Sequence, residues 1–211
     1  MTIKKTLSLA ASIISILILQ FFFLVNSNSQ EQNSKYYSND EGVLSIMYHR
    51  FNENKYPSTN IRMDVFNQQM LIIKELNFNF YKPQIFLNEF NNPKKEKKIL
   101  ITIDDGFKSF YTEAWPYLKK NKIPFILFVS TEPVGKHGYM NWDEIKEIEN
   151  SELGYIGHHS HTHEYLIDKS YSEFVKDIET ASQIFKKNLG YIPEIFSYPF
   201  GEYSKEMKDY I

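Results

Sequence analysis

Short apolar runs alternate with longer amphipathic stretches along most of this chain, from about residue 43 onward. The short runs are typical of buried strands, and the longer ones, with apolar residues three and four apart, are typical of helices. We predict strands at 43–48, 99–103, 124–129, 155–157 and 194–198. We predict helices at 64–76, 109–121, 142–148 and 172–188. Strands that alternate with helices indicate an α/β fold, a parallel sheet or barrel covered by helices.

The first 28 residues have a different pattern. Two lysines precede an uncharged apolar stretch over residues 7–25, and small residues follow it. This arrangement is typical of a secretory signal peptide, and the stretch is also long enough for a membrane anchor. We therefore predict export to the periplasm, the cell surface or the medium, with residues 1–28 either cleaved or retained as an anchor in the inner membrane. Residues 29–41 are predicted to be a polar linker to a domain over residues 42–211.

Composition narrows the chemistry of that domain. The chain has 211 residues, no cysteine and a formal net charge of −2. Because residues 1–28 contribute two lysines and no acidic residue, the remainder carries a net charge near −4, and we expect no nucleic-acid partner. The absence of cysteine excludes disulfides and thiolate chemistry, so an exported domain depends on its apolar core for stability.

Two adjacent carboxylates, Asp104 and Asp105, follow the predicted strand at 99–103 directly and precede Gly106. An Asp-Gly pair is common in turns, which gives this stretch a purely structural alternative. Catalytic groups in α/β folds nevertheless gather where strands end. Two adjacent carboxylates in apolar surroundings are also costly unless a cation or hydrogen bonds compensate them.

The stretch Gly-His-His-Ser-His-Thr-His, residues 157–163, contains four of the six histidines. His159 and His163 are four residues apart, a spacing that places both on one face whether the segment is extended or helical. Each histidine alone has a structural alternative, a hydrogen-bonded or surface imidazole. Together with one carboxylate, the pair resembles the open, three-ligand arrangement of catalytic zinc.

Three motifs resemble those of the polysaccharide deacetylase family, also called the NodB-homology domain or carbohydrate esterase family 4. They are Thr-Ile-Asp-Asp-Gly at 102–106, His-Ser-His-Thr-His at 159–163 and Ser-Tyr-Pro-Phe-Gly at 197–201, and they occur in the family's order. The resemblance extends from about residue 43 to the last residue. It implies a distorted (β/α) barrel, and we expect this barrel to be incomplete at its C-terminus because the chain stops before the last strands of such a fold.

The resemblance also implies roles for individual residues. Asp105, His159 and His163 are expected to bind a divalent metal, most often Zn²⁺, and Asp104 is expected to act as the general base toward a metal-bound water. The backbone N–H of Tyr198 is expected to stabilise the oxyanion, with Pro199 and Gly201 beside it in the substrate and oxyanion region.

Two departures from the family pattern concern the base and the general acid. Ser197 stands where the third motif usually has an arginine, and the usual acid histidine near the C-terminus is absent. The chain is therefore expected to be a fragment of a longer protein or a truncated copy. His49 offers a third explanation, because the run Leu-Ser-Ile-Met-Tyr-His at 44–49 resembles the first motif of a circularly permuted subgroup, the poly-N-acetylglucosamine deacetylases, in which the acid histidine follows the first strand. An ordinary strand-end residue is the structural alternative for His49.

The predicted activity is hydrolysis of N-acetyl groups on an extracellular or cell-wall polysaccharide of the poly-N-acetylglucosamine type, with acetylated polysaccharide as the partner. A metal and a base serve esters as well as amides. Removal of O-acetyl groups from xylan and deacetylation of peptidoglycan are therefore alternatives. A further alternative, from another class, is an exported glycan-binding protein that keeps the fold without turnover. The pair Asp104 and Asp105 argues against it, because binding alone gives no reason for a free base beside a metal ligand.

Overall fold

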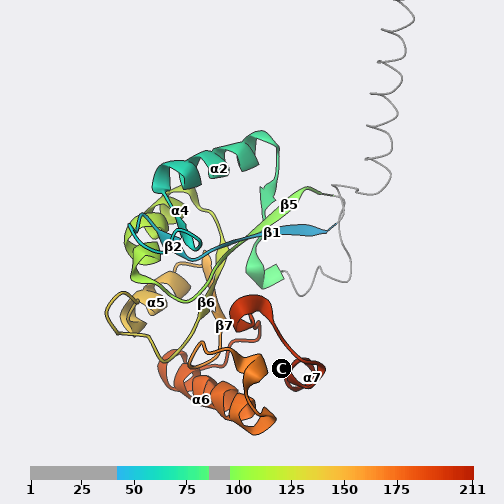
Figure 1. Cartoon of the computed structure of the whole chain (residues 1–211). Helices are drawn as coiled ribbons and strands as arrows, with labels where there is room; N and C mark the ends of the chain where they lie inside the picture. The colour runs from blue at the N-terminus through green and yellow to red at the C-terminus, as the bar shows by residue number, and fades with distance from the viewer. Residues whose placement is uncertain (1–41, 86–95) are drawn as a thin grey trace, which may run out of the picture. The chain divides into compact units, whose positions relative to one another are not determined.

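Parallel strands form the centre of the fold, in the order β1–β5–β6–β7 (Figure 1). The computed structural model describes residues 42–85 and 96–211. A short strand, β4, pairs with the first two residues of β5. Strand β6 pairs with the last two residues of β5, on the same edge as β4. A separate parallel pair, β2 and β3, follows β1 in the chain. The strands are β1 (Val43–Tyr48), β2 (Arg50–Phe51), β3 (Asn60–Ile61), β4 (Asn79–Phe80), β5 (Lys98–Ile103), β6 (Phe125–Val129) and β7 (Gly154–His158).

Helices lie along the outside of these strands (Figure 1). Asn141 and Ser170 begin α5 and α6 with capping boxes, in which the side chain accepts a hydrogen bond from the backbone N–H three residues on. Gly190 ends α6 with φ 87°, a left-handed conformation that favours glycine. The helices are α2 (Met63–Glu75), a π-helical turn (Phe110–Ala114) leading into α4 (Trp115–Asn121), α5 (Trp142–Glu149), α6 (Tyr171–Leu189) and α7 (Lys205–Tyr210), with 3₁₀ turns at Leu166–Asp168 and Pro199–Gly201.

The core follows from the alternation of side chains along the buried strands. Ile99, Ile101 and Ile103 of β5 belong to the main apolar cluster, which also includes residues of α2, α4 and α5. Leu100 belongs to a smaller cluster on the other face, with residues of β6. Both faces of β5 are therefore covered, as expected of a parallel sheet in an α/β fold of the distorted (β/α) barrel type.

Gly157 in β7 is required by close packing. A Cβ atom at this position would lie 2.3 Å from a ring carbon of Phe128 in the neighbouring strand. Any side chain here would displace the Phe128 ring from its place against β7.

The predicted helices and the first four predicted strands are confirmed, with boundaries that differ by at most one residue, although the helix predicted at 109–121 begins as a π-helical turn. The strand predicted at 194–198 is wrong. This segment forms only an isolated parallel bridge between His158 and Phe196, with hydrogen bonds from His158 N to Ile195 O (2.8 Å) and from Ser197 N to His158 O (3.0 Å). Pro199 follows closely and has no N–H to donate, so the pairing stops there. The bridge still places the third motif beside the end of β7.

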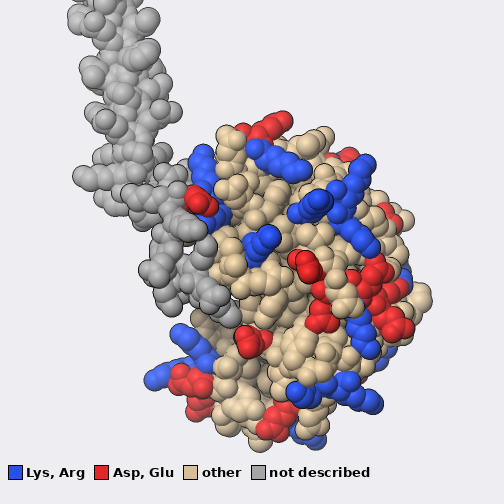
Figure 2. All heavy atoms as spheres, turned by 180° about the vertical axis from the view of Figure 1, so that it is seen from behind, with Lys and Arg blue, Asp and Glu red and all other residues tan. Residues whose placement is uncertain are grey.

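The surface of the described part carries both signs of charge. Figure 2 shows lysines and arginines interspersed with acidic residues over the face it presents. Within residues 42–85 and 96–211, no helix has the length and apolar character needed to span a membrane. The predicted signal or anchor at residues 1–28, its apolar stretch at 7–25 and the linker at 29–41 lie outside the described residues.

Candidate metal centre and active site

The carboxyl ends of the parallel strands meet at one edge of the sheet, and the candidate residues come directly after them. Tyr48 pairs with Ile103, and its carbonyl accepts a hydrogen bond from Asp104 N (2.9 Å). Val129 pairs with His158 in the same way. The next residues along this edge are therefore His49, Asp104, Ser130 and His159.

Asp105, His159 and His163 lie together. The Asp105 Oδ1 atom is 3.3 Å from His159 Nε2 and 2.9 Å from His163 Nε2. One ligand atom from each of the three residues lies within 4.8 Å of the others, which makes the group a possible metal site. Asp105 reaches this position with φ 74° and is followed by Gly106 with φ 78°. This left-handed turn directs the carboxylate away from the strand direction.

The residues present fit a metal ion. His159 Nδ1 is 2.8 Å from the carbonyl oxygen of Ser197, which can only accept, so Nδ1 carries the hydrogen and Nε2 presents its lone pair. Among the described residues, the buried Asp105 Oδ1 has no partner with hydrogen-bond geometry, although both imidazoles are close. A lone pair facing a carboxylate oxygen is repulsive unless a cation lies between them. An oxygen and two imidazole nitrogens are also a ligand set of catalytic zinc.

Asp105 and its imidazole neighbours interact electrostatically. Burial alone would raise the pKa of Asp105, but the neighbouring His159 and His163 outweigh it and hold that pKa below its usual range. Burial alone would lower the pKa of His163, and the Asp105 carboxylate outweighs it and raises that pKa. Asp105 is therefore ionised at neutral pH, as a metal ligand must be.

Asp104 is buried, with 4% of its surface exposed. It is the neighbour of Asp105 in sequence but is not one of the three candidate metal ligands. Its Oδ2 is 3.4 Å from the Ser197 hydroxyl, and its Oδ1 has no hydrogen-bond partner among the described residues. Burial raises the pKa of Asp104, while the nearby His159 and His49 act to lower it. A buried carboxylate with one open oxygen is suited to accept a proton.

The loop that carries the two imidazoles, residues 158–163, is called the histidine loop below. After His158, which ends β7, the loop is neither helical nor extended, because Ser160 (φ 67°) and His163 (φ 56°) both adopt left-handed conformations. The reasoning that a spacing of four places His159 and His163 on one face of a strand or helix was therefore wrong, although the two residues do meet. The meeting depends on a turn that hydrophobic periodicity does not encode.

The other two histidines of the loop have structural contacts. His158 Nδ1 accepts a hydrogen bond from Ser160 N (3.1 Å), and burial lowers the pKa of His158 to about 4. His161 Nδ1 is 2.8 Å from the hydroxyl of Thr131. Both imidazoles hold the loop and neither faces Asp105.

Asp177 of α6 is a residue that the sequence analysis missed. Its Oδ1 accepts from His161 N (2.7 Å), and its Oδ2 accepts from the backbone N–H (3.0 Å) and the hydroxyl (2.7 Å) of Thr162. Asp177 therefore fastens the histidine loop between its two candidate ligands. The available signal was an acidic residue among apolar ones on the buried face of α6, beside Phe174, Ile178 and Ala181.

The third motif lies next to the histidine loop. Tyr198 is half-buried and Pro199 is buried, whereas Phe200 is exposed and its ring packs against that of His163 at 5.0 Å between centroids. Gly201 N donates to Tyr198 O (2.9 Å), which closes the turn. Among the described residues, no backbone carbonyl accepts a hydrogen bond from the N–H of Tyr198.

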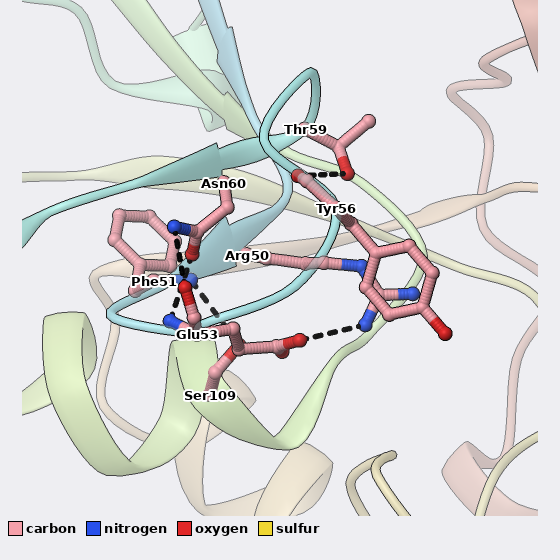
Figure 3. A network of polar contacts seen from close by, with 7 residues as sticks. All are labelled: Arg50, Phe51, Glu53, Tyr56, Thr59, Asn60 and Ser109. Carbon is pink, nitrogen blue, oxygen red and sulfur yellow. Dashed lines mark hydrogen bonds and ion pairs between the residues drawn. The ribbon is translucent and has the colours of Figure 1, made fainter.

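A cavity of about 490 Å³ opens beside the candidate metal ligands. Asp105 and His163 line one part of it, and Arg50, Tyr56 and Tyr139 line another. Its volume falls in the range of small-molecule sites, roughly 300–1,000 Å³. Figure 3 shows the contacts of Arg50 and its neighbours in this wall.

The sequence profile of the polysaccharide deacetylase family matches residues 91–211, more than half of the chain. The chain therefore belongs to this family and is an enzyme of the deacetylase class. Asp104, Asp105, His159, His163 and Tyr198 fall within the match, and His49 lies before it.

Individual relatives resemble a longer part of the chain. A poly-beta-1,6-N-acetyl-D-glucosamine N-deacetylase of Staphylococcus aureus (strain N315) is 24% identical over 232 residues, which cover 95% of this chain and 80% of the relative. The structure of IcaB from Ammonifex degensii matches with a TM-score of 0.71 and 28% identity, covering 80% of this chain and 78% of that one. The Streptococcus pyogenes deacetylase PplD matches in fold, with a TM-score of 0.70 and 22% identity over 79% of this chain and 77% of its own.

Proposed function

We propose that this enzyme removes N-acetyl groups from an exported polysaccharide of the poly-N-acetylglucosamine type, and that it uses a divalent cation, Zn²⁺, held by Asp105, His159 and His163. The observation that carries the proposal is the approach of both Nε2 atoms to the buried Asp105 Oδ1, beside the open oxygen of Asp104. The printed name of the S. aureus relative supports the substrate class. The sequence of residues 1–28 supports export.

The chain's own groups can complete an amide hydrolysis. A divalent cation in this site would polarise the acetyl carbonyl and lower the pKa of a water molecule. Asp104 accepts the proton of the attacking water through its open Oδ1. The N–H of Tyr198 donates a hydrogen bond to the oxyanion that forms on the carbonyl carbon.

The leaving amine needs a proton, and His49 is our candidate for supplying it. His49 follows β1, which pairs with the strand that carries Asp104, and it lies near enough to Asp104 to lower the pKa of that carboxyl. When the C–N bond breaks, the His49 proton passes to the sugar nitrogen and acetate leaves from the carbonyl side. The product is a glycan with a free amine.

Acetate release tests this proposal. Purified protein loaded with zinc is offered poly-N-acetylglucosamine, O-acetylated xylan and peptidoglycan, and acetate is measured by a coupled assay. We expect release from the first substrate and a loss of both activity and stoichiometric zinc in the His159→Ala/His163→Ala double variant. The matched control is His137→Ala, because His137 is an exposed loop histidine.

The outcomes separate the parts of the proposal. Zinc content equal in wild type and the double variant would refute the metal site. Faster release from O-acetylated xylan would replace the amide substrate with an ester. Binding of the glycans with no acetate release from any of them would favour a glycan-binding protein.

A further inference from the structure

Tyr56 lies in the wall of the cavity that also contains Asp105 and His163. It is 55% exposed, and its backbone has φ 60°. A left-handed conformation is unfavourable for a bulky residue and persists only where the surroundings impose it. An exposed aromatic ring held in a strained position beside a candidate active site calls for a reason other than core packing.

The ring of Tyr56 packs against a cation. The guanidinium carbon of Arg50 is 4.3 Å from the centroid of the Tyr56 ring and 3.4 Å from that of Phe107. Arg50 Nη1 donates to Glu53 Oε2 at 3.0 Å, which fixes the guanidinium in this position. Figure 3 shows the Tyr56 ring over the guanidinium.

The turn that carries Tyr56 is itself closed by side chains (Figure 3). Asn60 accepts from Glu53 N and donates to Glu53 O, both at 2.9 Å. The hydroxyl of Ser109, just before the π-helical turn, donates to Glu53 Oε1 at 2.7 Å. The aromatic ring is therefore positioned before any ligand arrives, which reduces the entropy lost on binding.

The rest of the wall combines flat apolar groups with polar ones. Tyr139, Pro133 and Phe107 supply the apolar area. Lys136 pairs with Glu132 at 2.9 Å at the same wall. A pyranose ring has an apolar C–H face and hydroxyl groups at its rim, so it can stack on a tyrosine ring and hydrogen-bond around it.

We propose that Tyr56 is the stacking platform of a saccharide subsite next to the position where the acetyl group is cleaved, and that the enzyme therefore acts on oligomers better than on single sugars. This inference rests on the proposed function, because it assigns a second sugar of the same glycan to the cavity. Arg50 is a positioning residue for the Tyr56 ring.

Kinetics on two kinds of substrate test the subsite. For Tyr56→Ala, we expect KM for a short oligomer of β-1,6-linked N-acetylglucosamine to rise roughly five- to tenfold, with unchanged kcat/KM for an activated aryl acetate that has no sugar. Tyr56→Phe keeps the ring and should retain the wild-type KM. Tyr171→Ala is the matched control, because Tyr171 is 49% exposed and does not line the cavity.

Tyr56→Gly provides a second readout, because glycine tolerates φ 60° and removes the ring. We expect its Tm to rise while its KM for the oligomer rises as well. A wild-type KM in both Tyr56→Ala and Tyr56→Gly, or an equal loss of activity on the aryl acetate, would overturn the subsite.

If wild type releases acetate from no glycan, the proposed function fails. Calorimetric titration with the oligomer then decides the subsite separately, with weaker binding by Tyr56→Ala expected and equal Kd values contradicting it.

Discussion

The histidine loop and the segment that runs from His49 to Ile61, here called the front segment, lie beside the same cavity but are held in different ways. Buried groups from separate elements fasten the histidine loop, including Asp177 of α6 and Ser130 after β6, whose hydroxyl donates to His159 O at 2.7 Å. The front segment is held by contacts within itself, such as the Arg50–Glu53 pair, and by Ser109 from outside it, and the Arg50 and Glu53 side chains are 17% and 25% exposed. Metal ligands need positions fixed to a fraction of an ångström, and the loop provides that. The front segment instead presents an exposed surface to a ligand.

Asp104 lies between the two regions, and its substitution should have the largest effect. Asp104→Asn keeps the size of the side chain but removes the base. We expect kcat for acetate release to fall by roughly 10²–10⁴ while zinc content stays near that of wild type. Atomic emission for zinc and acetate assays on the same preparation measure both. Loss of the zinc along with the activity would make Asp104 a ligand and reverse the roles of the two carboxylates.

His49 tests whether the front segment takes part in the chemistry. We expect His49→Ala to retain zinc and lower kcat/KM on N-acetylated glycan by roughly 10²-fold, since a general acid contributes on that order. Activated aryl acetates have leaving groups that need no proton, so their hydrolysis should change little. An equal loss on both substrates would mean that His49 does not protonate the leaving group. His137→Ala is the control for substitution of a histidine.

The fold and much of the candidate site could be predicted from sequence because strand and helix patterns depend on local hydrophobic periodicity. The buried run at 98–103 and the adjacent carboxylates made the position of Asp104 predictable at a strand end. The choice of Asp105 as the carboxylate that joins His159 and His163 needed the family resemblance, since left-handed turns at Asp105 and Ser160 have no periodic signature. These turns are fixed by tertiary hydrogen bonds.

Other parts of the site could not be predicted for the same reason. Asp177 is fourteen positions beyond His163 in sequence and contacts the histidine loop only after α6 has packed. Tyr56 lies in a segment with no regular pattern, and its place beside Arg50 depends on the closure of a turn by Asn60. Asp177 and Asn60 each act through hydrogen bonds between a side chain and a distant or turn backbone, and these form only once the chain has folded.

Asp177→Asn tests how much the positioning of the metal ligands matters, because Asp177 holds the histidine loop but does not bind the metal itself. The substitution keeps the shape but turns one acceptor into a donor, which then faces either the N–H of His161 or that of Thr162. We expect zinc affinity to weaken roughly 10–100-fold, as for other residues that orient ligands, with the fold retained. Competition with a chromophoric chelator measures the affinity, and circular dichroism checks the fold. Asp168→Asn is the control, because Asp168 is an exposed acidic residue. A zinc affinity of Asp177→Asn equal to that of wild type would show that the histidine loop holds its shape without the Asp177 carboxylate.

Glu53→Gln makes the corresponding change in the front segment and should have the smallest effect. The Arg50–Glu53 pair is partly exposed, so solvent screens it and its loss should cost less than about 1 kcal/mol of unfolding free energy. Gln can still accept from Ser109 and keeps the Asn60 contacts, which involve only the backbone of Glu53. We therefore expect unchanged zinc affinity and a rise of KM for the oligomer smaller than that of Tyr56→Ala, because Arg50 loses its charged partner but remains against Phe107. The two variants Glu53→Gln and Asp177→Asn are compared in parallel. Denaturant unfolding measures their stability, chelator competition their zinc affinity and oligomer kinetics their KM. A weaker zinc affinity in Glu53→Gln would contradict the separation of the two regions, because the front segment would then also position the metal ligands.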